Sequence, residues 1–154
     1  MQPNYDIVLL SKILSSVRLF DGMRREEVLR LLQLMSKSTY QAGHYIFREG
    51  DMGATLYVVA SGILEVRKNA GKNKVVTLAI LQPGDTFGEV ALVRDRIRSA
   101  SVYACEQCTV LGMETKSIWA VPELAAKLYL NISRLLADRL VIANEMLFDA
   151  QTRR

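Results

Sequence analysis

A carboxylate and a guanidinium lie about ten residues apart in the segment FGEVALVRDRIRSAS, which begins at Phe87. Glu89 and Arg98 are both flanked by small residues (Gly88, Ala91, Ser99, Ala100). An ionised carboxylate only accepts hydrogen bonds, whereas a guanidinium offers forked donors that match phosphate oxygens. Two interpretations follow: a surface ion pair worth at most about 1 kcal/mol, or the polar arms of a pocket for a small anion with hydroxyl groups. The ion pair does not explain the small residues, so we favour the pocket.

Short apolar runs rich in β-branched residues surround this segment between residues 38 and 114. The runs are LYVVA, ILEVR, VVTLAIL, ASVYA and CTVLGM, and the turns between strands centre on glycines (Gly43, Gly50, Gly62, Gly71, Gly84). A turn signal about every ten residues is typical of an antiparallel sandwich, barrel or jelly roll. Loops at the rim of such folds are the usual place for a ligand. We therefore place the 87–101 segment at the rim of a β-barrel.

Helical periodicity precedes and follows the barrel. Apolar residues at helical spacing predict one amphipathic helix over 6–17 and a second over 24–37. After the barrel, SIWAV predicts a short turn or helix, and Pro122 suits the first turn of one long helix that runs to about Ala150. The chain thus reads as a single α+β domain: N-terminal helices (1–37), β-barrel (38–114) and C-terminal helices (115–154).

The long helix carries two apolar stripes. One steps by four and three residues (Leu136, Leu140, Ala143, Leu147, Ala150). The other is interrupted by Arg139 (Leu128, Ile132, Leu135, Ile142, Met146). If one stripe packs on the barrel, the other needs a partner, because a long exposed apolar seam is a liability on a monomer. We expect a homodimer through this helix; the alternative is that the helix folds back onto its own domain.

Composition and charge exclude several classes. The net charge is +4, but the basic residues are scattered rather than gathered on one helix face, so they do not indicate nucleic-acid binding. The chain contains no apolar run of membrane-spanning length and no recognisable secretory leader. Two cysteines, Cys105 and Cys108, fit a reducing compartment, and we expect a cytoplasmic protein without membrane contact.

Metal and redox chemistry lack the necessary residues. A cupin-type metalloenzyme needs several histidines, and the chain has one, His44. Cys105 and Cys108 form a CxxC pair at a predicted hairpin, with no other cysteine to complete an iron–sulfur site. We expect no metal and no catalytic activity.

The residues of the central segment carry a resemblance to a known family. FGEVAL, followed after five residues by RSA, resembles the phosphate-binding cassette of cyclic nucleotide-binding domains. The preceding AGHYIFREGDMGATLYVVASGILEV and LQPGDTFGE resemble the family's glycine-punctuated first half and its entry into the cassette. The resemblance covers about residues 19–148. It implies an antiparallel β-barrel with N-terminal helices, a short cassette helix and a long C-terminal helix.

The resemblance also implies roles for the cassette residues. Gly88 and Glu89 would bind the ribose, and Arg98 and Ser99 the cyclic phosphate, together with the amide of Ala91. These roles agree with the chemistry of the side chains. A glycine lets the backbone approach a ligand closely, and a helical turn after it would direct free amides at an anion.

The purine contacts are less specific. Leu78 and Val90 resemble the family's apolar contacts to the base, and each could equally be a core residue. In the long helix, LADRLVIANEML resembles the stretch that covers the purine in bacterial transcription regulators of this family, with Asn144 placed to read the base edge. A solvated polar residue is the alternative for Asn144.

The implied function is that of a receptor for cAMP, or for cGMP. Ser99 follows the cassette arginine, where alanine is common in cAMP binders and threonine in cGMP-selective members; we favour cAMP. The bacterial regulators continue into a DNA-binding helix-turn-helix, whereas this chain reads DAQTRR after the long helix. We therefore expect no direct DNA binding, and signalling through helix movement to an unknown effector. A degenerate scaffold that dimerises without ligand is the alternative.

Overall fold

The computed structural model describes residues 12–153 except Leu14 and Asp95, and of Ala91 it describes the backbone alone. The helices are η1 (Arg18–Phe20, a 3-10 turn), α2 (Arg25–Gln33), α3 (Val90–Val93), α4 (Thr115–Trp119) and α5 (Pro122–Thr152). The strands are β1 (Ser36–Tyr40), β2 (Tyr45–Phe47), β3 (Thr55–Ser61), β4 (Leu64–Asn69), β5 (Val75–Leu81), β6 (Thr86–Phe87), β7 (Ser101–Ala104) and β8 (Cys108–Glu114).

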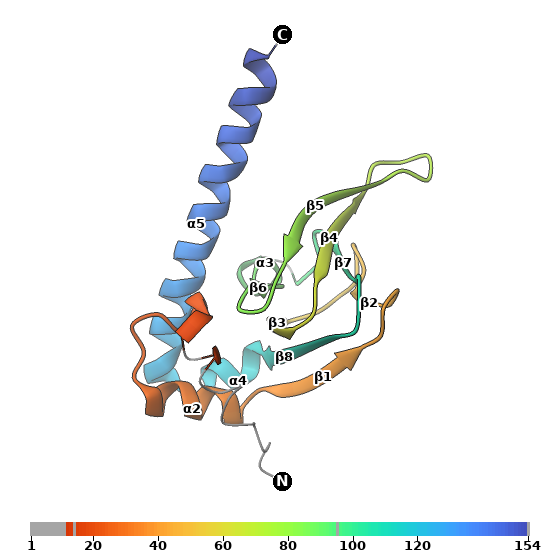
Figure 1. Ribbon diagram of the computed structural model, residues 1–154. Coiled ribbons are helices and arrows are strands. Elements are labelled where there is room, and N and C mark those ends of the chain that lie inside the picture. Colours follow the sequence, from red (N-terminus) through yellow and green to blue (C-terminus); the bar gives the residue numbers. More distant parts are fainter. Residues whose placement is uncertain (1–11, 14, 95, 154) are drawn as a thin grey trace.

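The strands form two four-stranded antiparallel sheets. Their orders are β1-β8-β3-β6 and β2-β7-β4-β5. Figure 1 shows the sheets beside the long helix α5, with the β4–β5 hairpin extending away from the rest of the strands. The predicted α+β jelly roll with flanking helices is therefore confirmed.

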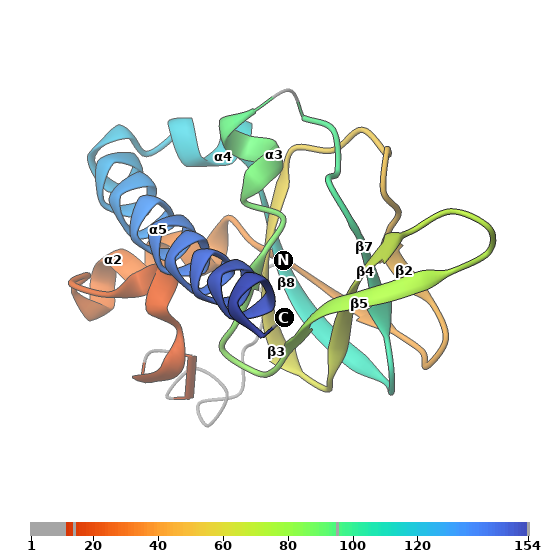
Figure 2. The same ribbon diagram turned by 90° about the horizontal axis from the view of Figure 1, so that it is seen from above.

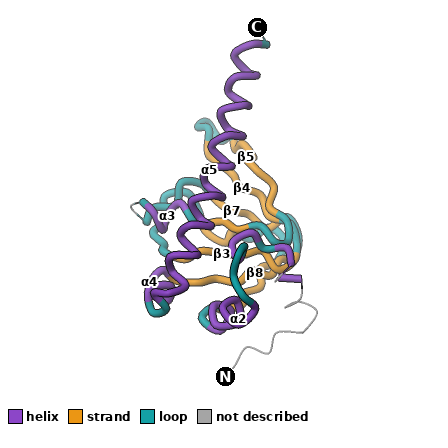
Figure 3. The backbone as a smooth tube through the Cα atoms, turned by 90° about the vertical axis from the view of Figure 1, so that its left-hand side faces the viewer, coloured by secondary structure: helices purple, strands orange, loops and turns teal. Residues whose placement is uncertain are grey.

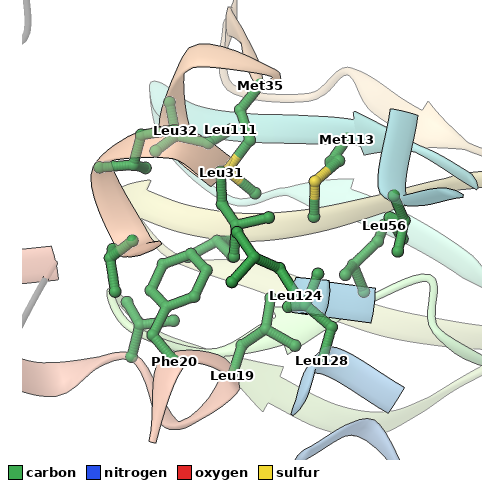
Figure 4. Packing of buried hydrophobic residues seen from close by; sticks show 14 of the residues in the cluster. Leu19, Phe20, Leu31, Leu32, Met35, Leu56, Leu111, Met113, Leu124 and Leu128 are labelled. Carbon is green, nitrogen blue, oxygen red and sulfur yellow. The ribbon is translucent and has the colours of Figure 1, made fainter. Parts of the chain in front are cut away.

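Two clusters of buried apolar side chains hold the sheets and helices together, and strand β3 contributes residues to both clusters. Its Leu56 and Val58 pack against the helices, whereas Val59 lies in the cluster between the sheets, as the two-residue period of a strand requires. Figure 4 shows the helix-side cluster, in which Leu124 and Leu128 of α5 lie beside residues from η1, α2 and the strands. This cluster fixes the start of α5 to the domain.

The second half of α5 leaves the domain. Leu128, Ile132 and Leu135 are buried, but every described residue after Leu136 is exposed. The exposed residues include large apolar side chains (Leu140, Val141, Ile142, Met146, Leu147, Phe148). Figure 2 looks along the C-terminal end of α5, and Figure 3 shows it rising beyond the strands. The stripe predicted to cover the barrel therefore does so only as far as Leu135, because the helix is longer than the surface beneath it.

Element boundaries differ from the predicted ones where long-range pairing decides them. The second helix ends at Gln33 rather than at residue 37, because Ser36 already pairs with Gly112 of β8. The short strands β2 and β6 carry too few residues to give a periodic signal. Most of the helix predicted over 6–17 lies outside the described residues. No helix within the described ranges is long and apolar enough to cross a membrane.

Candidate functional site

A cavity of about 180 Å³ lies between the sheet β2-β7-β4-β5, the segment after β6 and α5. Its walls are largely apolar (Phe47, Val66, Ala79, Leu81, Phe87, Val90, Ala100, Val102). Its polar side chains come from three places (Glu89 after β6, Arg98 and Ser99 before β7, Arg139 on α5). Such a cavity, apolar with a few convergent polar groups, is typical of a small-molecule site.

Arg98 is a buried cation, with 4% of its surface exposed. Its Nη1 donates to the carbonyl of Gly88 at 3.1 Å and its Nη2 to the carbonyl of Thr55 at 3.0 Å. Its Nε has no acceptor among the described residues, and none of their carboxylates forms an ion pair with it. Burial lowers the pKa of Arg98 from its ordinary value, since desolvation disfavours the charged form. The site thus holds a buried cation that forms no ion pair with a carboxylate of the described residues, although the charge of Asp51 also acts on it.

Glu89 is the second buried charge, with 2% of its surface exposed. Nη1 of Arg139 forms an ion pair with Oε1 of Glu89, and Nη2 of Arg139 donates to the carbonyl of Thr86. Desolvation lowers the pKa of Arg139. The contact joins α5 to the segment that carries Gly88 and Glu89.

Gly88 is required by both conformation and space. Its φ of +82° lies in the left-handed region, which side chains disfavour. A Cβ at this position would lie 2.8 Å from the carbonyl oxygen of Thr55 and 2.9 Å from Nη1 of Arg98. Glycine therefore lets the backbone approach Arg98 closely enough to accept its hydrogen bond.

The backbone of Ser99 is hydrogen-bonded to a residue outside the cavity. Its carbonyl accepts a hydrogen bond of 2.8 Å from Nζ of Lys68, and Lys68 also pairs with Glu49 at 2.9 Å. Ser99 is also among the residues that line the cavity.

The structure brings five of the eight sequence-predicted site residues into this one lining (Gly88, Glu89, Val90, Arg98, Ser99). Ala91 follows Val90 in α3. Leu78 lies on β5 with 54% of its surface exposed, outside the lining. Asn144 is exposed on α5, five residues beyond Arg139, and is also outside the lining.

Alternation along β5 places Leu78 and Ile80 on the outer face, opposite Ala79 and Leu81, and a bulge lies at Leu78. Val66 pairs with Ala79 and Arg67 with Thr77, so Leu78 is the extra residue on β5. Ala79 and Leu81 line the cavity in its place. The bulge depends on the pairing of two strands and has no signal in the β5 sequence itself.

Sequence reasoning missed Arg139 as a site residue. The available signal was its position, because it interrupts an apolar stripe of the long helix. A cation within such a stripe either faces solvent or meets a buried carboxylate, and here it meets Glu89.

Other reactive groups lie elsewhere. Cys105 is exposed, Cys108 is buried, and both thiols are free. Burial raises the pKa of each thiol, which disfavours the reactive thiolate. No group of three or more metal-ligating side chains occurs within the part of the chain that the structure describes.

Comparison with known proteins agrees with this geometry. The family model of the cyclic nucleotide-binding domain matches residues 37–123, more than half of the chain. The chain therefore belongs to the cyclic nucleotide-binding domain family, and the resemblance inferred from the cassette is confirmed.

Individual relatives place the chain within that family. It is 36% identical to the cyclic AMP receptor protein of Thermus thermophilus over 79% of the chain and 56% of the receptor. The crystal structure of the catabolite activator protein of that organism matches with a TM-score of 0.80 and 34% identity, over 87% of this chain and 63% of that one. Human cGMP-dependent protein kinase 2 is 33% identical over 66% of the chain and 14% of the kinase. The chain thus spans little more than half of the receptor it matches.

Proposed function

We propose that this chain is a non-catalytic receptor domain for a 3′,5′-cyclic nucleotide, with cAMP as the favoured ligand. The observation that carries the proposal is the buried guanidinium of Arg98, which forms no ion pair with a carboxylate in the described part of the chain and shares one cavity with buried Glu89. A buried cation without an anion is costly, so a site of this kind is suited to an anionic ligand.

The chemistry of each wall assigns the parts of the ligand. The cyclic phosphate would lie at Arg98 and Ser99, with the amide of Ala91 as a further donor. The ribose hydroxyl would donate to Glu89, whose Oε2 remains available while Oε1 pairs with Arg139. The purine would occupy the apolar part of the cavity beside Val90.

Leu78 and Asn144 remain proposed contacts to the purine base, but the protein would have to change conformation to bring them to the ligand. Both are exposed and lie outside the cavity lining. Contact with a purine would require α5 and the β4–β5 hairpin to close over the ligand. Such closure would be limited by the ligand's difference in affinity between the open and closed states.

Arg139 supplies the link from ligand to helix. The same carboxylate would accept from the ribose and from Arg139, so occupancy of the site would bias the position of α5. The exposed apolar half of α5 would pair with a second copy, and a change in helix position would then reach the dimer or an effector protein. We infer no direct contact with DNA for the residues of this chain.

Calorimetric titration with cAMP and with cGMP tests the proposal. We expect the wild type to bind cAMP more tightly than cGMP, and Arg98→Leu to lose about 2–5 kcal/mol of binding free energy. At a hundred times the Kd, cAMP should stabilise the fold by about 2.7 kcal/mol, a rise in Tm of roughly 5–10 °C for a chain of this size. No shift with either nucleotide at millimolar concentration would favour a ligand-free scaffold, and tighter binding of cGMP would reverse the assigned preference.

A further inference from the structure

The loop between β2 and β3, residues 48–54, runs beside the segment that carries Arg98. The amide of Arg98 donates to the carbonyl of Asp51 at 2.9 Å, and the carbonyl of Arg98 accepts from the amide of Gly50 at 2.9 Å. The amide of Gly53 donates to the carbonyl of Arg96 at 2.9 Å, and Met52 forms a β-bridge with Ile97. This loop therefore fixes the backbone from which the Arg98 side chain starts.

The loop also contacts the guanidinium itself, through Gly53. A Cβ built on Gly53 would lie 2.8 Å from Nη2 of Arg98, 2.9 Å from its Nε and 3.1 Å from its Cζ. The centroid of the Phe47 ring lies 4.1 Å from the same Cζ. The carbonyls of Gly88 and Thr55 accept from the two ends of the fork. The guanidinium thus sits in a close-fitting slot, one wall of which is the bare Cα of Gly53.

The backbone conformation of Gly53 does not demand glycine. Gly50 and Gly88 adopt φ angles of +88° and +82°, whereas Gly53 is not among the glycines with positive φ. Alanine could adopt the same backbone without the strain that a positive φ imposes. The need for glycine at this position comes from the space that Arg98 occupies.

We propose that Gly53 is a positioning residue for anion binding, which acts through Arg98 and touches no ligand. A methyl group at position 53 would make the guanidinium retreat by about 0.6 Å to reach an ordinary contact. That retreat would weaken the hydrogen bonds to Gly88 and Thr55 and shift the fork from its present position in the cavity wall. This inference rests on the proposed function, since the anion is the cyclic phosphate that Arg98 would bind.

Gly53→Ala is the direct test, and Gly112→Ala is its matched control. Gly112 also lacks a positive φ, and a Cβ there would crowd Tyr57 at 3.1 Å and Thr55 at 3.2 Å, with no atom of Arg98 among its three nearest neighbours. We expect Gly53→Ala to weaken cAMP binding roughly 10- to 100-fold, because charge-assisted hydrogen bonds are displaced. Gly112→Ala should lower the Tm and leave the Kd within about threefold. Equal Kd values for Gly53→Ala and the wild type would overturn the inference.

An Arg98→Lys background separates positioning from a general loss of structure. Lysine has no Nε–Nη2 edge to meet a methyl group at position 53. Gly53→Ala should therefore cost less than about threefold in Kd when residue 98 is lysine. The same fold loss in both backgrounds would show that Gly53 acts without Arg98.

A measurement without ligand keeps this inference distinct from the proposed function. The ¹H–¹⁵N signal of the Arg98 Nε–H, assigned by its loss in Arg98→Lys, should shift farther in Gly53→Ala than in Gly112→Ala, whose methyl group crowds Tyr57 and Thr55 rather than the guanidinium. If the wild type bound neither nucleotide, the proposed function would be wrong, but the signal would still decide the role of Gly53. An unshifted signal in Gly53→Ala would refute it.

Discussion

Replacing Arg139 by glutamine removes the cation that faces the buried carboxylate of Glu89. Glu89 has 2% of its side chain exposed and Arg139 has 42%. The main effect of the substitution is therefore to leave the buried carboxylate of Glu89 without its charged partner. Removing one partner of a buried pair costs about 3–5 kcal/mol, and water that reaches the open side of this pair should reduce the cost to about 1–3 kcal/mol. With an m value of roughly 2 kcal/mol per molar urea, the unfolding midpoint should fall by about 0.5–1.5 M.

Urea denaturation followed by far-UV circular dichroism measures this loss. Arg134→Gln is the matched control on the same helix, because within the described residues Arg134 donates a single long hydrogen bond of 3.5 Å, to Asn131. A second variant, Glu89→Gln, removes the charge that needs a partner. The double variant should therefore recover part of the loss, with a coupling energy of about 1 kcal/mol or more. A midpoint for Arg139→Gln equal to that of Arg134→Gln would refute the claim that Arg139 holds Glu89 in solution.

Three further predictions concern the frame around the site. The hydrogen-bonded Lys127 lowers the pKa of Glu27 from 4.5 to about 2. The contribution of the Glu27–Lys127 pair to stability should therefore be complete above pH 4.5 and lost as the pH falls toward 2. In thermal denaturation across this range, the Tm of Glu27→Gln should depend less on pH than the Tm of the wild type. Leu128→Ala should destabilise the fold by about 2–5 kcal/mol in urea denaturation. Leu147→Ala should leave the stability of the monomer unchanged and weaken self-association in analytical sedimentation. A wild type that sediments as a monomer at high concentration would contradict the dimer. Asn131→Ala should lower the free energy of unfolding by about 1–3 kcal/mol in the same urea assay. The reason is that the buried Nδ2 of Asn131 donates to the carbonyls of Leu19 and Asp21 at 2.8 and 2.9 Å. A loss below about 0.5 kcal/mol would contradict that role.

The features that sequence predicted well are those encoded within a few neighbouring residues. The runs that became β3, β4, β5, β7 and β8 carried both β-branched residues and glycine turns, and the cassette carried its glycine and its two charges at a fixed spacing. Pro122 opens α5 as its fixed φ predicts. In each case the local chain already holds the physical cause.

The features that sequence missed depend on contacts between distant segments. The face of β5 that meets the cavity is set by its pairing with β4, and the role of Arg139 follows from a carboxylate fifty residues earlier. The crowding of Gly53 becomes visible only when the 48–54 loop lies against Arg98. None of these has a periodic or compositional signature, because each arises from two segments that meet only in the folded chain.

The balance of charge in the cavity follows from this long-range assembly. Its charged lining residues are Glu89, Arg98 and Arg139. Arg139 compensates Glu89, whereas the acceptors of Arg98 are two neutral carbonyls, which orient the guanidinium without cancelling its charge. The charges of the lining residues therefore sum to one positive charge, equal and opposite to that of a cyclic phosphate diester, while Asp51 acts on Arg98 from outside the lining. Because carboxylate pairing at Arg98 would have removed that charge, the use of carbonyls in its place is what leaves the site suited to a monoanion.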